Sequence, residues 1–499
     1  MRSLLVLILC VLAIGSTMPW WGRDTSLPAG TPRLAVGSCV TFDPLQASSL
    51  DEFRVLDALF EGLVRLDPTT LQPQPALADS WQCASDGVTW TFTLGARHWS
   101  DGSPVTATQM AAGLTHHQAG SATGALLHSL VRISADDEHT VRIVTGSPMP
   151  WLPAVLATPV FIPWHPAMDQ AQAWTDPERF ITNGPLLCHD YIPRHHLDLA
   201  PSATYSGPLP ARGALRLLTV DDAGTAVRLY LDHRVDAVLR LTTDTVGDLV
   251  RAHAPDLQRN PSWGTEFYRV RVGGTRAPVP ADIRQALSAA IDRPALVAEL
   301  LGGNGTPAYG LIPPSAAALG YHTLALPPTG SDHPPAPNPL PADTQLELVV
   351  PANQAERLRI AEWLCDHWRR VLGINVTLVT VPSNQAMSRT KALDYDLARG
   401  SLVGDYLDPA YFLDCFRGTS GMNRTGYADA QFEQLLSDAA ARPDQRMALL
   451  ASAEQRLLAS GAIIPLYHYS CAFLVAPELS GIQANTLELV HYAAVGRTK

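Results

Sequence analysis

The sequence predicts an α/β fold, and three observations support this prediction. First, residues 346–399 alternate between short apolar segments and segments with helical periodicity, a pattern typical of parallel strands joined by helices. Second, 46% of the residues are hydrophobic and 17% are charged, which is the composition of a well-packed globular protein. Third, 499 residues are enough for about two to four domains.

Helices are predicted where apolar residues recur every three or four positions. The clearest is 354–372, which is followed by Gly373, a residue that commonly ends helices. The other predicted helices cover residues 52–63, 226–231, 281–291, 383–391 and 447–458, with one more beginning at Thr106 and one at Asp429. Strands are predicted for the alternating or β-branched segments at 34–42, 88–94, 215–220, 234–238, 265–272, 346–350, 374–381, 394–399 and 463–469.

The amino terminus has the features of an export signal. Arg2 precedes an apolar run from Leu4 to Ile14, which is too short to span a bilayer and has the length of a signal-peptide core. We predict that residues 1–23 are a signal peptide. Because Trp20 and Trp21 could lie at a membrane interface, an uncleaved anchor is the alternative.

Charge and cysteine spacing exclude several classes of protein. The net charge is −11 and no basic run occurs, so neither nucleic acid nor an anionic membrane surface is expected as a partner. Six cysteines follow the leader without a CxxC pair, which excludes a zinc ribbon and a thioredoxin motif. Disulfides and buried free thiols both stay open; Cys365 falls on the apolar face of helix 354–372.

Motifs for catalysis or metal binding are weak. Ser388 and Lys391 match S-x-x-K without its partner motifs, and no G-x-S-x-G, P-loop or H-E-x-x-H occurs. The pairs 116–117 and 195–196 are adjacent histidines, a poor geometry for one metal ion. We expect both pairs on a solvated surface, and we expect no enzyme activity, cofactor or metal.

The strongest candidate for binding is Asp405. It follows the strand predicted at 394–399, and Asp408 and Pro409 then open a helix. Open α/β sheets bind ligands at the carboxyl ends of their strands. A carboxylate in these apolar, aromatic surroundings favours a cation, which a ligand can supply. The alternative is that Asp405 caps a turn.

Several motifs in the right order resemble one protein family. They are FEGL at 60–63, PALADSW at 75–81, WTF at 90–92, WSDGSPVTA at 99–107 and GDYLDP at 404–409. On these motifs the chain resembles the extracellular solute-binding proteins of oligopeptide and dipeptide ABC transporters. The resemblance covers nearly the whole mature chain, but a Pro-rich segment at 323–343 replaces a helix that is usual in the family.

The resemblance implies a fold like type II periplasmic binding proteins, with two α/β lobes, a hinge and an extra β-rich subdomain. It implies a discontinuous lobe I made of residues 24–60, 179–263 and 478–499. The extra subdomain would be 61–178, and lobe II, which carries the site for the ligand amine, would be 264–477.

The resemblance also implies roles for four ligand-binding residues. Asp405, within the family's A-D-Y-x-x-P pattern with Tyr406, would pair with the α-amino group of a peptide. Arg399 would help to receive a peptide carboxylate, unless it pairs with Asp394 or Asp396. Asn423 would lie near the peptide backbone, unless it caps the local structure.

The function implied by the resemblance is the exported binding component of an ABC importer. It would bind short peptides between its lobes and deliver them to a permease and ATPase in the inner membrane. We expect a periplasmic monomer. A nickel-chelate or haem-binding member of the family and a sensor or chaperone that has lost transport are the alternatives. Ser48, Leu402 and Val403 stand where peptide-binding members can carry an acidic residue, Trp and Cys, so peptide length and side-chain preference stay open.

Overall fold

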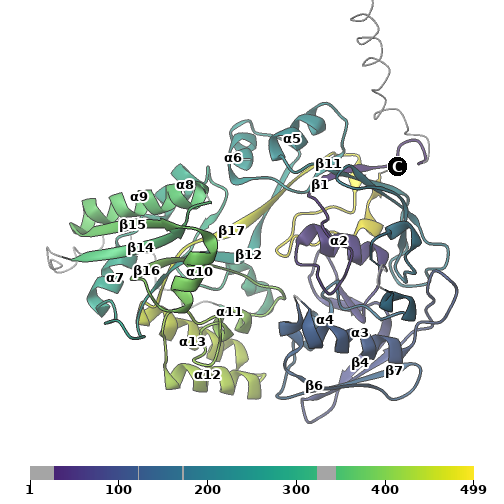
Figure 1. The fold of residues 1–499 in the computed structure, drawn as a ribbon, viewed down its shortest axis with the longest axis horizontal. Coiled ribbons are helices and arrows are strands. Elements are labelled where there is room, and N and C mark those ends of the chain that lie inside the picture. Colours follow the sequence, from purple (N-terminus) through teal and green to yellow (C-terminus); the bar gives the residue numbers. More distant parts are fainter. Residues whose placement is uncertain (1–26, 122, 171–173, 323–343, 354, 499) are drawn as a thin grey trace, which may run out of the picture.

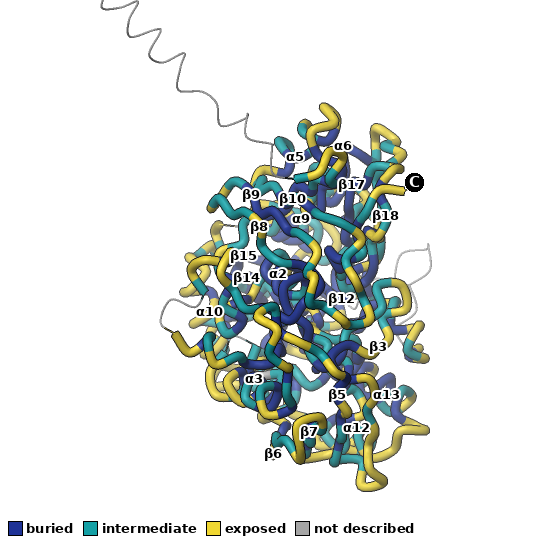
Figure 2. Tube along the Cα trace, turned by 90° about the vertical axis from the view of Figure 1, so that its right-hand side faces the viewer, coloured by how far each residue is buried: buried dark blue, intermediate teal, exposed yellow. Residues whose placement is uncertain are grey.

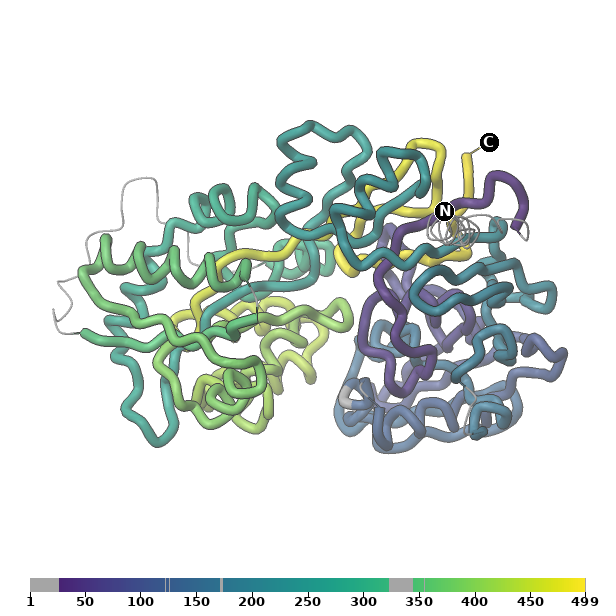
Figure 3. The backbone as a smooth tube through the Cα atoms, turned by 45° about the horizontal axis from the view of Figure 1, so that its top comes forward, coloured from purple at the N-terminus to yellow at the C-terminus, as the bar shows by residue number. Residues whose placement is uncertain are grey.

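A computed structural model describes residues 27–121, 123–170, 174–322, 344–353 and 355–498. The predicted leader and the Pro-rich segment lie outside the described residues. One sheet has strands in both halves of the molecule, and Figures 1 and 3 show these two halves side by side with chain segments crossing between them. Its strand order is β15-β14-β16-β12-β17-β11-β1-β10-β9-β8. Among the described helices, none is long and apolar enough to cross a membrane.

Two long strands, β12 (Leu257–Val270) and β17 (Ile463–Val475), cross between the lobes. They pair with each other antiparallel along most of their length, but the register shifts between Pro261 and Thr265. Such irregularities bend a strand locally. We therefore expect the hinge at this point. The predicted boundary between lobe I and lobe II, at 263/264, lies between Pro261 and Thr265. The predicted change at 477/478 comes just after the end of β17.

Lobe II confirms the predicted α/β alternation. Its elements are β14 (Gln345–Pro351), α9 (Ala355–Leu372), β15 (Asn375–Val381), α10 (Ser383–Lys391) and β16 (Leu397–Val403). β14 pairs parallel with both β15 and β16. On α9, Ile360, Leu364, Cys365 and Trp368 are buried at helical spacing, so one face of this helix packs on the sheet.

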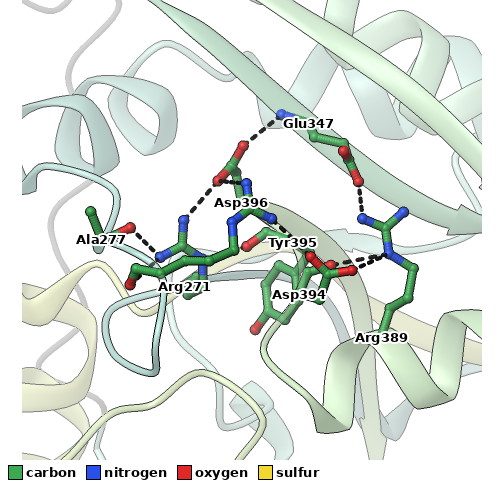
Figure 4. A network of polar contacts seen from close by, with 8 residues as sticks. Arg271, Ala277, Glu347, Arg389, Asp394, Tyr395 and Asp396 are labelled. Atoms are coloured by element: carbon green, nitrogen blue, oxygen red, sulfur yellow. Dashed lines mark hydrogen bonds and ion pairs between the residues drawn. The ribbon is translucent and has the colours of Figure 1, made fainter.

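The last strand of this unit lies three residues later than predicted. Residues 394–399 alternate like a strand, but the ladder with β12 begins only at Leu397. Figure 4 shows the reason: the carboxylate of Asp396 contacts Arg271, and that of Asp394 contacts Arg389. The two aspartates of the alternating segment therefore belong to a network of ion pairs, and strand β16 runs from Leu397 to Val403.

Lobe I is built around β1 (Arg33–Val36), which pairs parallel with β10 (Leu215–Thr219) and β11 (Ala237–Val238). The predicted strand 34–42 is thus too long. The Glu52 carboxylate accepts hydrogen bonds from the backbone N–H groups of Val40, Thr41, Ser48 and Ser49. These bonds fold residues 40–49 back onto the start of α2 (Leu50–Leu59), so the chain leaves the sheet after β1.

The region predicted as the extra subdomain holds a separate antiparallel sheet. Its strand order is β4 (Ala78–Cys83), β5 (Thr89–Leu94), β7 (Thr140–Thr145) and β6 (Leu130–Ala135). Thr106 begins α3 (Ala107–Gly120) with a capping box, as predicted. One apolar core is continuous from this sheet into lobe I. Figure 2 colours buried residues dark blue. The exact boundaries 61 and 178 stay predictions.

The remaining strands and helices complete the two lobes and the subdomain. In lobe I and the subdomain they are β2 (Val64–Leu66), β3 (Pro73–Pro75), α4 (Leu152–Leu156), β8 (Leu186–Ile192), β9 (His196–Pro201), α5 (Ala223–Leu231), α6 (Thr243–Arg251), β18 (Leu479–Ser480) and β19 (Gly496–Arg497). In lobe II they are α7 (Ala281–Ala289), α8 (Arg293–Leu300), β13 (Thr306–Pro307), α11 (Ala410–Asp414), α12 (Ala430–Ala441) and α13 (Arg446–Ser460). Short 3₁₀ turns lie at 124–127, 166–169, 177–179, 314–319 and 492–494.

Candidate ligand-binding site

Asp405 lies directly after β16, as predicted, and the hinge strand holds it in place. The Gly404 N–H donates to the Trp263 carbonyl (2.8 Å), and the Trp263 indole N–H donates to the Tyr406 carbonyl (2.9 Å). A Cβ atom at position 404 would lie 2.2 Å from the Trp263 ring, so the close approach requires glycine. The residues on both sides of Asp405 are therefore fixed to β12.

A cavity of about 250 Å³ lies between the lobes beside Asp405; we call it the interlobe cavity. Its wall combines α2, the hinge residues Ser262 and Trp263, residues 403–405 and the carboxy-terminal segment 486–490. The subdomain contributes Leu66 and residues from the segments 123–126 and 154–159. The charged residues that line it are Arg54, Asp57, Asp405 and Glu488. Most of the other lining side chains are apolar, which is usual for ligand cavities.

Within the described part of the chain, the Asp405 carboxylate has one hydrogen bond and no cationic partner. The Tyr411 hydroxyl donates to its Oδ2 (2.9 Å), and the described residues include no ion pair to it. Its side chain is exposed toward the cavity, yet the surrounding protein displaces enough water that burial raises its pKa, although the Tyr411 hydrogen bond acts in the opposite direction. An acidic group in this state gains from a positively charged ligand.

Tyr406 packs next to Asp405 but outside the cavity. Its ring packs edge-on against the Tyr411 ring (5.3 Å between centroids) and lies against the core of lobe I. It does not line the interlobe cavity. We interpret Tyr406 as a residue that positions the loop. Its neighbour Asp408 accepts from the Ala410 N–H (2.8 Å) at the start of α11 and pairs with Arg446 (2.8 Å).

Arg399 pairs with Glu266 of β12, and not with Asp394 or Asp396. Two hydrogen bonds of 2.8 Å join its guanidinium to both Glu266 oxygens. Arg357 in the first turn of α9 lies 3.8 Å from the same carboxylate. Arg357 also pairs with Glu356 (2.7 Å), so two guanidinium groups and two carboxylates balance one another in this cluster. The sequence prediction missed Arg357 because its contact with Glu266 joins residues that are far apart in the chain.

Asn423 holds its own loop together. Its amide donates to the carbonyls of Phe416 (3.1 Å), Arg417 (3.2 Å) and Tyr427 (2.8 Å), and its oxygen accepts from the Thr425 N–H and hydroxyl. It does not line the interlobe cavity. The structure therefore brings Asp405 and Tyr406 together, while Arg399 belongs to the Glu266 cluster and Asn423 to the loop after α11.

The two histidine pairs are not solvated as predicted, because one member of each is buried. His117 is fully buried beside Ser121 (3.0 Å), and His196 is buried with its ring beside His195. Asp190, His196 and Asp198 are close enough together for one metal ion. However, both oxygens of Asp198 already pair with Arg216 (2.7 and 2.6 Å). The six cysteines at positions 39, 83, 188, 365, 415 and 471 are free thiols in this structure, and Cys365 is buried.

Comparisons with known proteins agree with this architecture. The family model for bacterial extracellular solute-binding proteins, family 5 Middle, matches residues 72–424. The dipeptide-binding protein DppE of Bacillus subtilis is 24% identical over 89% of this chain and 87% of that protein. The periplasmic murein peptide-binding protein MppA of Escherichia coli is 26% identical over 91% of this chain and 90% of that protein.

Solved structures show the same fold. The unliganded open form of MppA, a periplasmic murein tripeptide-binding protein, superposes with a TM-score of 0.80, at 23% identity, over 94% of this chain and 98% of that one. The complex of Haemophilus influenzae OppA with RPPGFSPFR gives 0.74, at 20% identity, over 95% and 100%. The fold is therefore that of a type II periplasmic binding protein, and the chain belongs to the bacterial extracellular solute-binding proteins of family 5.

Proposed function

We propose that this protein binds short peptides in the interlobe cavity and delivers them to an ABC permease and ATPase. The single observation that carries the proposal is Asp405: an ionisable carboxylate that lines the cavity and has no cationic partner in the described chain. The α-amino group of a peptide would supply the missing cation. The names of the relatives DppE, MppA and OppA, which refer to peptides, support the same class of ligand.

The carboxyl end of a bound peptide would lie toward Arg399 and Arg357. Arg399 lies in β16 and precedes Asp405 by six residues, a separation of at most about 20 Å if the chain between them is extended. Each guanidinium offers several N–H donors, and a peptide carboxylate could accept from those that Glu266 and Glu356 do not use. Because Arg side chains reach several ångströms toward a ligand, an extended peptide of about three to five residues would join the two sites.

Export to the periplasm is part of the proposal. The apolar run in the amino-terminal 23 residues supports a leader or an anchor, and the relatives MppA and OppA of Escherichia coli are named as periplasmic proteins. We propose a monomer whose two lobes close on the ligand about β12 and β17, without chemistry of its own.

Native mass spectrometry and thermal shifts test the proposal directly. We expect peptide adducts on the protein purified from its export compartment. Free di- to pentapeptides should raise the melting temperature, whereas N-acetylated peptides should not, because acetylation removes the amine charge. Asp405→Asn should abolish the shift. Asp366→Asn, at an exposed site on α9, is the matched control and should keep it.

The proposal fails if no free-amine peptide binds. It also fails if acetylated and free peptides bind equally well, or if Asp405→Asn binds as tightly as the control variant. The presence of permease and ATPase genes beside this gene would separate transport from a sensor that binds peptides without delivering them.

A further inference from the structure

The charges on the cavity wall do not balance. Four charged residues line the interlobe cavity: Arg54, Asp57, Asp405 and Glu488. Among the residues that the structure describes, two of them have ion-pair partners outside the cavity wall, and the other two form no ion pair. Since enclosed charges are stable only when they are paired, the two unpaired groups indicate what the cavity is built to receive.

Arg54 is neutralised within lobe I. Its guanidinium contacts the Asp51 carboxylate (3.3 Å) and donates to the carbonyl of Glu488 (2.8 Å). It also lies over the Phe473 ring (5.6 Å). With only 3% of its side chain exposed, Arg54 is held as part of the wall, and its charge is matched by Asp51.

Asp57 is neutralised by His491. The ring Nδ1 of His491 lies 2.6 Å from Asp57 Oδ2, and Nε2 lies 2.8 Å from the Leu66 carbonyl. A carbonyl can only accept, so Nε2 carries a hydrogen. The remaining proton lies between Nδ1 and the carboxylate, and the pair has zero net charge whichever atom holds it.

Glu488 has no such partner. Its carboxylate receives a hydrogen bond from Ser262 and is attracted by the Arg54 charge, which Asp51 opposes. Among the described residues, however, no cationic nitrogen lies within ion-pair distance of it. Its backbone adopts φ +56°, a conformation that is costly for glutamate. Asn485 holds it there, because its side chain contacts the Leu487 and Leu489 N–H groups and the Leu489 carbonyl.

We propose that the interlobe cavity selects ligands with two positive charges, one at Asp405 in lobe II and a second at Glu488 in lobe I. This inference rests on the proposed function, and the ligand we commit to is a peptide whose first residue is basic. Its α-amino group would pair with Asp405 and its side chain would reach Glu488. A free diamine has the same chemistry and is distinguished by the test below.

Two properties of the wall agree with a basic side chain at this place. Leu50, Phe53 and Leu487 line the cavity beside Glu488 and would cover the methylene groups of a lysine. Burial raises the pKa of Glu488, as it does for Asp405. A bound dication would reverse both shifts, so ligand binding should release protons.

Calorimetric titration with matched ligands tests the inference. The probes are Lys-Ala-Ala, norleucine-Ala-Ala, a Lys-Ala-Ala acetylated only on the side chain, and 1,5-diaminopentane. We expect Lys-Ala-Ala to bind about tenfold or more tightly than the norleucine and side-chain-acetylated peptides, the effect of one charge-assisted contact. Glu488→Gln should reduce this ratio to about one without changing the affinity for norleucine-Ala-Ala. Glu478→Gln, exposed on the same terminal segment, should keep it.

The other outcomes separate the dication inference from the proposed function. Equal binding of the three peptides by the unmodified protein overturns the inference and leaves the proposed function intact, and this comparison does not depend on any variant folding. A preference that survives Glu488→Gln also overturns it. Binding of diaminopentane alone, dependent on Glu488, supports the dication and refutes peptides. Binding of none of the four refutes both proposals.

Discussion

Gly404→Ala should damage both the fold and the binding site through one contact. The new Cβ atom would lie 2.2 and 2.3 Å from two atoms of the Trp263 indole, and Trp263 is 1% exposed, so the packed ring or the backbone at position 404 has to move. Overpacking of this kind costs about 1–3 kcal/mol. The indole hydrogen bond to the Tyr406 carbonyl would be lost as well, which adds about 1 kcal/mol. We therefore expect the variant to lose about 2–4 kcal/mol of unfolding free energy.

A double-mutant cycle with Trp263→Leu tests this reasoning. Removing the indole makes room for the methyl group, so Gly404→Ala in that background should cost less than about 0.5 kcal/mol. Urea unfolding followed by far-ultraviolet circular dichroism measures all four proteins without relying on tryptophan fluorescence. Gly421→Ala is the control, because nothing lies within 4 Å of a Cβ atom there. Equal costs for Gly404→Ala in both backgrounds, or equal costs at positions 404 and 421, would refute the argument.

Three further predictions follow from charged groups. Burial raises the pKa of Glu61 to about 7 from 4.5, so the stability that protonated Glu61 contributes is complete below pH 4.5 and is lost as the pH rises through 7. Between pH 4 and pH 8 the unmodified protein should lose on the order of 3 kcal/mol relative to Glu61→Gln, as measured by urea unfolding at each pH; parallel curves would contradict this. Arg446→Met leaves the Asp408 carboxylate, buried at 8% exposure, without its partner, and should cost about 3–5 kcal/mol. Arg456→Met, at a more exposed pair, should cost much less; equal losses would show that burial is not the cause. Burial raises the pKa of Asp405 above 3.8, so this carboxylate becomes protonated at a higher pH than a free aspartate. Peptide affinity should therefore weaken as the pH falls toward 3.8. If Asp405→Asn shows the same dependence of affinity on pH, another group causes the effect.

The fold and Asp405 could be predicted because their signals are local. The alternation of strands and helices in lobe II and the step from β16 to Pro409 lie within short stretches of sequence. The partner of Arg399 could not be predicted in this way. Asp394 and Asp396 were its nearest acidic neighbours in sequence, but both face the arginines in Figure 4. Glu266 is 133 positions away and meets Arg399 only because β12 and β16 pair.

The same limit applies to the lobe I side of the cavity. Asp57 and His491 are 434 positions apart, and nothing near Glu488 in the sequence marks it as part of a ligand site. Its position depends on a turn held by Asn485 and on the return of the chain through β17. Charges that meet only after the termini of the chain come together need the tertiary structure to be recognised.

The irregular pairing of β12 and β17 has a mechanical consequence. Ser262 and Trp263 lie at the pivot and also form part of the cavity wall, and Trp263 grips the residues that flank Asp405. In a rotation, displacement grows with distance from the axis, so the contact to a ligand amine would change little while the distant rim swings. Binding of the first residue and enclosure of the remainder are thereby separate events. A ligand could bind through its amino-terminal residue before the two lobes close.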